Sequence, residues 1–123
     1  MGQYGSRIAA LERQAERDHQ TLADGTCDAD PERARSYLRE GVGPAVWIYV
    51  EARTGGRRRY ISPAEFDALE RAMNRWFECY AACHGVDLEA EYTVREVAEL
   101  LLETRNIHDV GELLTGVPVS DGE

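Results

Sequence analysis

The sequence predicts an α+β domain in which a β-hairpin packs on one long central helix, with further helices at the N-terminal and C-terminal ends. Three observations predict this fold class. Residues 45–61 alternate apolar and polar side chains around a pair of glycines, residues 63–84 carry a helical stripe of large apolar side chains, and capping residues precede the later helices. With 123 residues, 43% of them hydrophobic, the chain has the length and apolar content of one domain.

The first 43 residues predict two helices. Apolar side chains recur there at three- and four-residue steps, which predicts a helix over residues 3–23: Tyr4, Ile8, Leu11, Ala15 and Leu22. Asp30 and Pro31 predict a short helix that extends through Leu38, because aspartate caps helices and proline favours their first turn. Since large apolar residues are few, we expect this N-terminal helical segment to pack on the rest of the chain or on a second copy of it.

The β-hairpin is predicted from a two-residue period. Val46, Ile48 and Val50 alternate with side chains of the opposite face, which is typical of a strand. Gly55 and Gly56 then predict a two-residue turn, because glycine adopts the positive φ angles that such turns need. The return strand would end at residue 61.

The central helix is predicted over residues 63–84. Ser62 and Glu65 form a capping-box pattern around Pro63, and Gly85 marks the end of the helix. One stripe carries its large apolar side chains, which makes it the obvious cover for the hairpin: Phe66, Leu69, Met73, Trp76, Tyr80 and Cys83.

The remaining chain predicts one short strand and two helices. Residues 87–92 alternate and permit a third, edge strand. Thr93 and Glu96 predict the capping box of a helix that ends at Asn106, and a last helix is predicted over 109–115. The predicted organisation is thus one domain, made of an N-terminal helical segment, a compact α+β core and a frayed tail, over residues 1–43, 44–118 and 119–123.

The charge composition points to an unusual solvent. All 14 basic residues are arginine, against 23 acidic residues, and the formal net charge is −9. An acidic chain without lysine resembles the proteins of extreme halophiles, where molar salt screens the repulsion between carboxylates. The acidic excess opposes non-specific capture by nucleic acids or anionic membranes.

Features of the sequence favour a cytoplasmic protein that does not enter a membrane. It contains no run of 18 apolar residues, and its first residues lack the continuous apolar stretch of a secretory signal. Its three cysteines are an odd number, which favours a reducing compartment over a disulfide framework.

The first candidate site is an arginine cluster at the tip of the predicted hairpin, consisting of Arg53, Arg57, Arg58, Arg59 and Tyr60. In the predicted register Arg53 lies opposite Arg58, and this like-charge pair would weaken the hairpin unless a ligand or carboxylates offset it. Such a cluster could grip the phosphates of a nucleic acid, or it could bind an acidic partner. The alternative is that the arginines neutralise the protein's own carboxylates, within the chain or across a dimer.

The second candidate site is a metal site formed by Cys79, Cys83 and His84. The two cysteines lie one helical turn apart and could both face a zinc ion, but zinc prefers four ligands, so His19 and Cys27 would have to join them. The alternative is that the cysteines pack in the core and that His84 is a favourable cation at the helix end.

No enzyme motif is present, and Glu78, Glu91, Glu103 and His108 occur in no recognisable acid–base arrangement. The helix pair at 94–115 has the length of a helix-turn-helix, but its second helix lacks basic residues, which favours a packing role. The sequence therefore predicts a non-enzymatic interaction or binding module without a bound cofactor that acts as a homo-oligomer, most simply a homodimer. The alternatives are a nucleic-acid-binding regulator that uses the arginine cluster and a zinc-binding protein.

Overall fold

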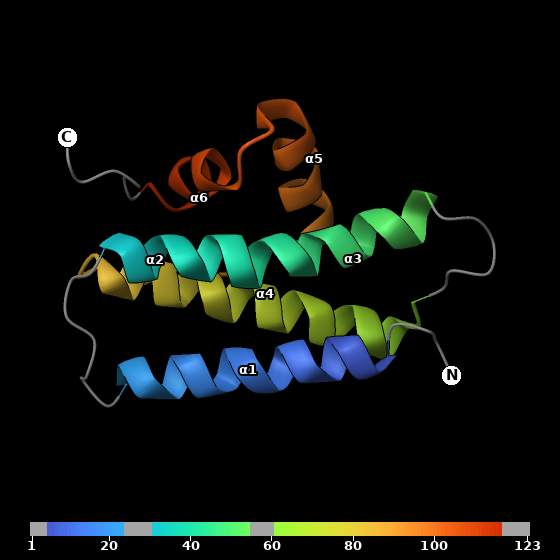
Figure 1. The fold of residues 1–123 in the computed structure, drawn as a ribbon, viewed down its shortest axis with the longest axis horizontal. Helices are drawn as coiled ribbons and strands as arrows, with labels where there is room; N and C mark the ends of the chain where they lie inside the picture. Colours follow the sequence, from blue (N-terminus) through green and yellow to red (C-terminus); the bar gives the residue numbers. More distant parts are fainter. Residues whose placement is uncertain (1–4, 24–30, 55–60, 117–123) are drawn as a thin grey trace.

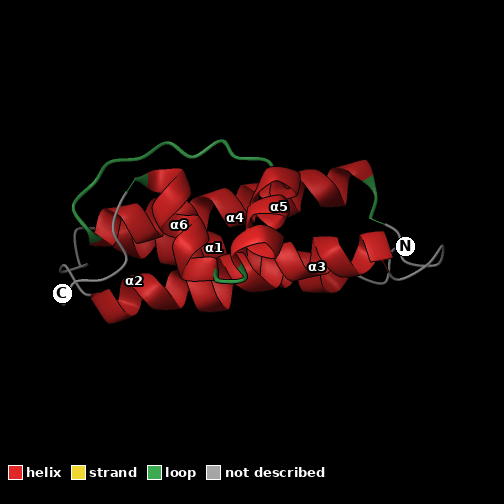
Figure 2. Ribbon diagram, turned by 90° about the horizontal axis from the view of Figure 1, so that it is seen from above, coloured by secondary structure: helices red, strands yellow, loops and turns green. Residues whose placement is uncertain are grey.

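The computed structural model describes residues 5–23, 31–54 and 61–116, and these ranges contain helices and connecting segments but no strand. The predicted α+β class is therefore wrong, and the described part of the predicted α+β core is helical (Figure 2). Along these ranges the elements follow in the order α1 Gly5–Ala23, α2 Pro31–Tyr37, the π-helical turn η1 Leu38–Val42, α3 Gly43–Thr54, α4 Pro63–Cys83, α5 Val94–Thr104 and α6 Ile107–Thr115.

Three long rods form the main layer of the fold. They are α1, α4 and the nearly continuous run of α2, η1 and α3, and they lie side by side in Figure 1. α1 and α4 run in the same direction, whereas the α2–α3 run points the opposite way. α5 packs on α3 and α6 packs on η1, so the last two helices cover one side of the α2–α3 run. None of the helices in the described ranges is long and apolar enough to cross a lipid bilayer.

The segment predicted as the first strand of the hairpin is the helix α3. Its sequence is apolar at almost every position from Pro44 to Val50, so it fits a helical period as well as a period of two. The observed burial follows the helical period: Val42, Ala45 and Val46 are fully buried, and Tyr49 is half-buried one turn further on. A helix packed between α4 and α5 buries more than one face, which explains why Ile48 is apolar as well. The predicted turn and most of the return strand fall on residues 55–60, outside the described residues.

Proline and glycine explain why α2 passes into α3 through a π-helical turn. The amide of Gly43 donates to the carbonyl of Leu38, five residues earlier, which is the π-helical pattern. Pro44 follows directly, and a proline inside a helix has no N–H and its ring disturbs the preceding turn. The wider turn places Gly41 against the indole of Trp76, so that α2–α3 and α4 approach closely.

The two predicted capping boxes are confirmed, whereas Asp30, the predicted cap of the second helix, lies outside the described residues. Ser62 accepts a hydrogen bond from the Glu65 amide at 3.2 Å, and the Glu65 carboxylate accepts one from the Ser62 amide at 3.0 Å. Thr93 and Glu96 form the same box at the start of α5. The central helix also agrees with its prediction, since its apolar stripe is buried except for half-buried Phe66. α6 begins two residues earlier than predicted, because Asn106 caps it.

The predicted third strand at 87–92 is also wrong. This segment is extended but pairs with no strand in the described ranges. It returns from the end of α4 to the start of α5 along the outside of α4 (Figure 2). The alternation that suggested a strand reflects its one-sided burial, with Ala90 buried, Tyr92 half-buried, and Glu89 and Glu91 exposed.

Candidate functional site

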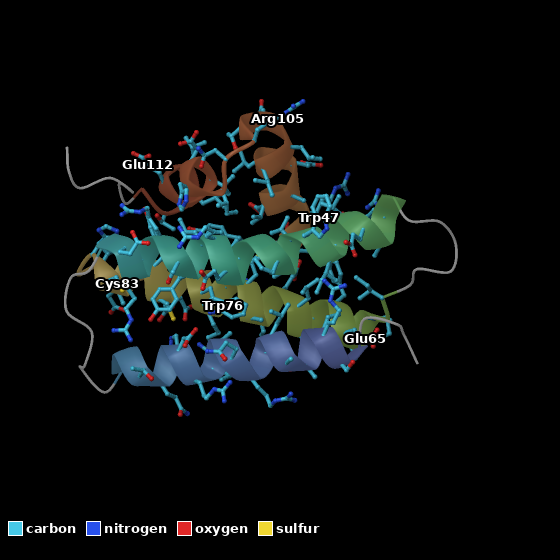
Figure 3. The ribbon with its side chains drawn as sticks, in the orientation of Figure 1. Trp47, Glu65, Trp76, Cys83, Arg105 and Glu112 are labelled. Carbon is cyan, nitrogen blue, oxygen red and sulfur yellow. The ribbon has the colours of Figure 1, made fainter. Side chains whose placement is uncertain are left out.

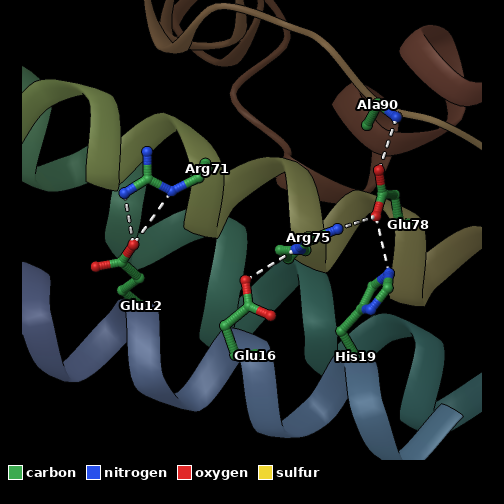
Figure 4. A network of polar contacts seen from close by, with 7 residues as sticks. All are labelled: Glu12, Glu16, His19, Arg71, Arg75, Glu78 and Ala90. Atoms are coloured by element: carbon green, nitrogen blue, oxygen red, sulfur yellow. Dashed lines mark hydrogen bonds and ion pairs between the residues drawn. The ribbon is translucent and has the colours of Figure 1, made fainter. Parts of the chain in front are cut away.

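One flank of α4 forms a row of polar contacts with α1 (Figure 4). Arg71 contacts Glu12 at 2.7 Å, Arg75 contacts Glu16 at 2.9 Å, and His19 Nε2 lies 2.9 Å from Glu78 Oε1; in each pair the partners are 59 residues apart. A constant separation is the signature of two parallel helices in register. Exposed ion pairs contribute little individually, at about 0–1 kcal/mol, so the row acts mainly to fix that register.

Glu78 is the meeting point of three elements. Its Oε1 lies 2.9 Å from His19 Nε2 of α1 and accepts, at 3.3 Å, from Arg75 of α4, while its Oε2 accepts from the Ala90 amide at 3.0 Å (Figure 4). The side chain is only 15% exposed, and two hydrogen-bond donors together with the contact to His19 offset the cost of its partial burial. This carboxylate therefore ties α1, α4 and the extended segment together.

The other flank of α4 binds the backbone of the extended segment. Glu70 accepts from the Val94 amide at 2.9 Å, and Asn74 both accepts from the Tyr92 amide and donates to the Tyr92 carbonyl, each at 3.0 Å. Four residues of helix rise about 6 Å, and two residues of extended chain about 6.6 Å. These lengths match, so side chains at every fourth position of α4 meet alternate residues of the extended segment, running antiparallel.

A trough of about 440 Å³ lies on α4 between α1 and the extended segment, and most of its polar groups are engaged in the contacts above. Arg71 and Arg75 are ion-paired with glutamates of α1, and Glu70, Asn74 and Glu78 hold the extended segment. We conclude that the trough is built mainly to hold the fold. From the sequence, Glu78 was recognised only as an isolated acid. The roles of Glu70, Asn74 and His19 in holding the extended segment and α1 on α4 were not predicted.

A second surface feature is a groove of about 190 Å³ between α3 and α5, which we call the α3–α5 groove. Val50, Ala98 and Leu102 provide its apolar part, and Leu102 is 62% exposed. Arg53, Arg95 and Glu99 line it as well. The groove thus combines exposed apolar surface with two arginines and one glutamate.

Of the predicted arginine cluster, only Arg53 lies in the described ranges. It is exposed on the last turn of α3, where its NH1 donates to the Tyr49 hydroxyl at 2.9 Å and its guanidinium lies 5.6 Å from the centre of the Tyr49 ring. Arg57, Arg58, Arg59 and Tyr60 lie outside the described residues, so their binding of nucleic acid or of an acidic partner stays a prediction. The predicted hairpin pairing of Arg53 with Arg58 is wrong for Arg53, which is helical.

The predicted metal ligands occupy the end of α4. Cys79 and Cys83 are buried in the hydrophobic core, and Figure 3 shows Cys83 at the end of α4. His84 forms the C-cap, and its ring lies 5.1 Å from that of Tyr80. Within the described ranges, no group of three His, Cys, Asp or Glu side chains is placed to hold a metal ion. His19 is directed to Glu78, and Cys27 is outside the described residues. Zinc binding stays a prediction.

The environment of His108 predicts that the stability of the fold depends on pH. Its Nδ1 is buried without a hydrogen-bond partner in the described part of the chain, and burial, together with nearby Arg39 and Arg35, lowers the pKa of its imidazole; Asp109 and Glu32 oppose this shift. A lowered folded-state pKa means that the unfolded chain binds the proton more tightly. The free energy of unfolding should therefore keep the full contribution of neutral His108 above the ordinary histidine pKa of 6.5. It should decrease as the pH drops below that value.

When the pH is lowered from about 8 to about 5, we expect the free energy of unfolding to decrease less in His108→Gln than in the wild type, because glutamine does not titrate. The measurement is urea unfolding of both proteins across this range. Carboxylates titrate in both chains, so the difference between them isolates the histidine. If the free energy of unfolding changed equally with pH in the two proteins, the expectation would be contradicted.

Comparison with known proteins gives one match. A family model described as Domain of unknown function (DUF8055) matches residues 2–119. No curated protein and no solved structure matches the chain.

Proposed function

The chain belongs to the family described as Domain of unknown function (DUF8055), and from this premise we propose that it is a non-enzymatic interaction module that self-associates through the α3–α5 groove. The observation that carries the proposal is the groove itself, in which a largely exposed leucine and two arginines occur together. An apolar surface lined by arginines suits a partner that offers an apolar side chain flanked by carboxylates.

The size of the groove suits a single aliphatic side chain. Its volume of about 190 Å³ exceeds the roughly 150 Å³ of an engineered cavity that binds benzene. Val50, Ala98 and Leu102 would contact such a side chain, while Arg53 and Arg95 would pair with carboxylates beside it. Arg95 already contacts Glu99 at 3.4 Å, but both side chains are exposed, so this pair is weak and can exchange partners.

The same chain carries a complementary stripe on α6, which we call the α6 stripe. It consists of Asp109, Glu112 and Leu113, at positions i, i+3 and i+4, so the three side chains lie on one face. All three residues are exposed, and Leu113 is 63% exposed. Glu112 lies on the outer side of α6 in Figure 3. The occupant we infer for the α3–α5 groove is therefore the α6 stripe of a second copy.

A two-fold dimer would use this contact twice, since each copy supplies one groove and one stripe. Burial of one leucine side chain contributes about 1.5–3 kcal/mol. A micromolar complex requires about 8 kcal/mol, so two such contacts with their ion pairs give a weak dimer. We therefore expect the association to depend on protein concentration.

The test is a charge exchange followed by sedimentation equilibrium over a range of concentrations in moderate salt. Arg95→Glu alone and Glu112→Arg alone should each weaken the dimer, and the double variant should recover it, because the opposite charges are again paired. Leu113→Asp should abolish the dimer. Arg13→Glu, a reversal on exposed α1, is the matched control and should leave the mass unchanged.

Two results would contradict the proposal. One is a monomeric mass at every concentration up to about 1 mM, at which a dimer with a micromolar Kd would be almost completely formed. The other is a dimer that survives Leu113→Asp, which would place the interface elsewhere.

A further inference from the structure

A separate cavity of about 320 Å³ lies where α1 faces α2 and η1. Asp18 of α1, Arg33 and Tyr37 of α2, Glu40 and Gly41 of η1 and Trp76 of α4 are among its lining residues, so the cavity carries two carboxylates and one guanidinium. Its volume is at the lower end of the range for small-molecule sites in proteins. The proposed self-association uses none of these residues.

The π-helical turn shapes this cavity. A Cβ atom at Gly41 would lie 2.4–2.7 Å from three carbons of the Trp76 indole, so only glycine allows this approach. The indole is therefore fixed under the turn, with its Nε1 directed to Asp18 at 3.0 Å. π-helical turns occur often at functional sites, because the widened turn re-aims side chains and backbone.

Asp18 has hydrogen-bonding capacity beyond its contacts within the protein. One of its oxygens accepts from Trp76 Nε1 and the other from Gln14 Nε2, each at 3.0 Å. An ionised carboxylate offers about four acceptor positions, so two remain for N–H donors from the cavity. An ammonium group, with three donors and a positive charge, matches this need.

Tyr37 and Arg33 supply a hydrogen-bond donor and a positive charge, whereas Asp18 supplies acceptors and a negative charge. Tyr37 is only 7% exposed, and it lines the cavity. Burial raises the pKa of Tyr37, which keeps the hydroxyl protonated as a donor. Arg33 lies one helical turn before Tyr37 and adds a positive charge on the same side of α2. Together they suit an anionic group such as a carboxylate.

We propose that this cavity binds a small zwitterion of the size of a free amino acid, whose ammonium donates to Asp18 and whose carboxylate accepts from Tyr37 and Arg33. A ligand that carries only one of the two charges satisfies half of the site. The site therefore distinguishes free amino acids from their N-acetyl and amide derivatives.

The experiment titrates the full chain with each of the common free L-amino acids and follows Trp76 fluorescence and the heat of binding. The only other tryptophan, Trp47, is exposed and is replaced in a Trp47→Phe background, so the signal reports on the cavity. We expect saturable binding of at least one amino acid. Its N-acetyl form and its amide should each bind about tenfold more weakly or worse, since each loses a charge-assisted hydrogen bond.

Two substitutions locate the site. Asp18→Asn keeps an acceptor for Trp76 but removes the charge, and it should weaken binding about tenfold or more. Arg33→Gln should weaken binding of the amino acid but leave the affinity for its amide unchanged, a readout that holds even if Asp18→Asn fails to fold. Arg13→Gln on the exposed side of α1 is the control and should bind like the parent. Absence of binding by every amino acid, equal binding of an N-acetyl form, or full affinity in Arg33→Gln would overturn the proposal.

Discussion

Replacing Gly41 with alanine is expected to lower the free energy of unfolding by about 2 kcal/mol. Alanine normally stabilises a helical position by about 1 kcal/mol relative to glycine. Here the new methyl group would lie 2.4 Å from a carbon of the Trp76 indole, which is 2% exposed and held by Asp18. Overpacking of a filled core costs about 1–3 kcal/mol and more for rigid groups, so the steric cost exceeds the helical gain.

Two other glycines serve as controls in the same urea-unfolding experiment. At Gly43 the nearest atom to a new Cβ outside the neighbouring residues is the Leu38 carbonyl oxygen at 3.4 Å, so only the local strain of a helical alanine before Pro44 opposes Gly43→Ala, and it should cost less than Gly41→Ala. At Gly111 the nearest atoms are the flexible end of the Leu38 side chain, and the cost should be smaller than at Gly41. A Gly41→Ala protein as stable as Gly43→Ala would show that the helices are not in close contact at this point.

Replacing Asn74 with alanine is expected to cost about 2–3 kcal/mol and to loosen the extended segment. The substitution removes both hydrogen bonds to Tyr92 and leaves a half-buried backbone amide and carbonyl without partners. A hydrogen bond contributes about 1 kcal/mol net, and an unsatisfied group costs about 1–3 kcal/mol. Urea unfolding measures the loss, and hydrogen exchange at the Tyr92 amide should become faster.

Asp67→Ala is the matched control for this prediction, because Asp67 is exposed on the same helix and lines the same trough. Its substitution should change stability by no more than about 0.5 kcal/mol. If exchange at Tyr92 were unchanged in Asn74→Ala, the extended segment would be held by something other than the side chains of α4.

The starts of α4 and α5 could be predicted because their chemistry is local. Ser62 with Glu65 and Thr93 with Glu96 each contain the complete capping interaction within four residues. The prediction of the first strand was wrong because a stretch that is apolar at almost every position fits the period of a helix as well as that of a strand. Whether Val46 and Ile48 belong to a strand or a helix depends on the neighbours, and α4 and α5 bury this stretch on more than one face.

The polar contacts of α4 could not be predicted for the same physical reason. Glu70, Asn74 and Glu78 at every fourth position are typical of a solvated helix face, and nothing local shows that a later segment will bind them. Their role appears only when residues 90–94 run back along the helix with a matching repeat. Likewise, Glu12 and Arg71 become partners only through the parallel arrangement of α1 and α4.

The parallel arrangement of α1 and α4 also sets the order of events during synthesis. Each contact in the row joins residues 59 positions apart, so α1 has no α4 to dock on until Cys83 has been translated. A nascent chain that ends near Thr54 holds α1 and α3 with their apolar stripes uncovered, and such surfaces promote aggregation. Completion of this fold thus waits for the second half of the chain, and fragments of its first half are the species that chaperones would have to protect.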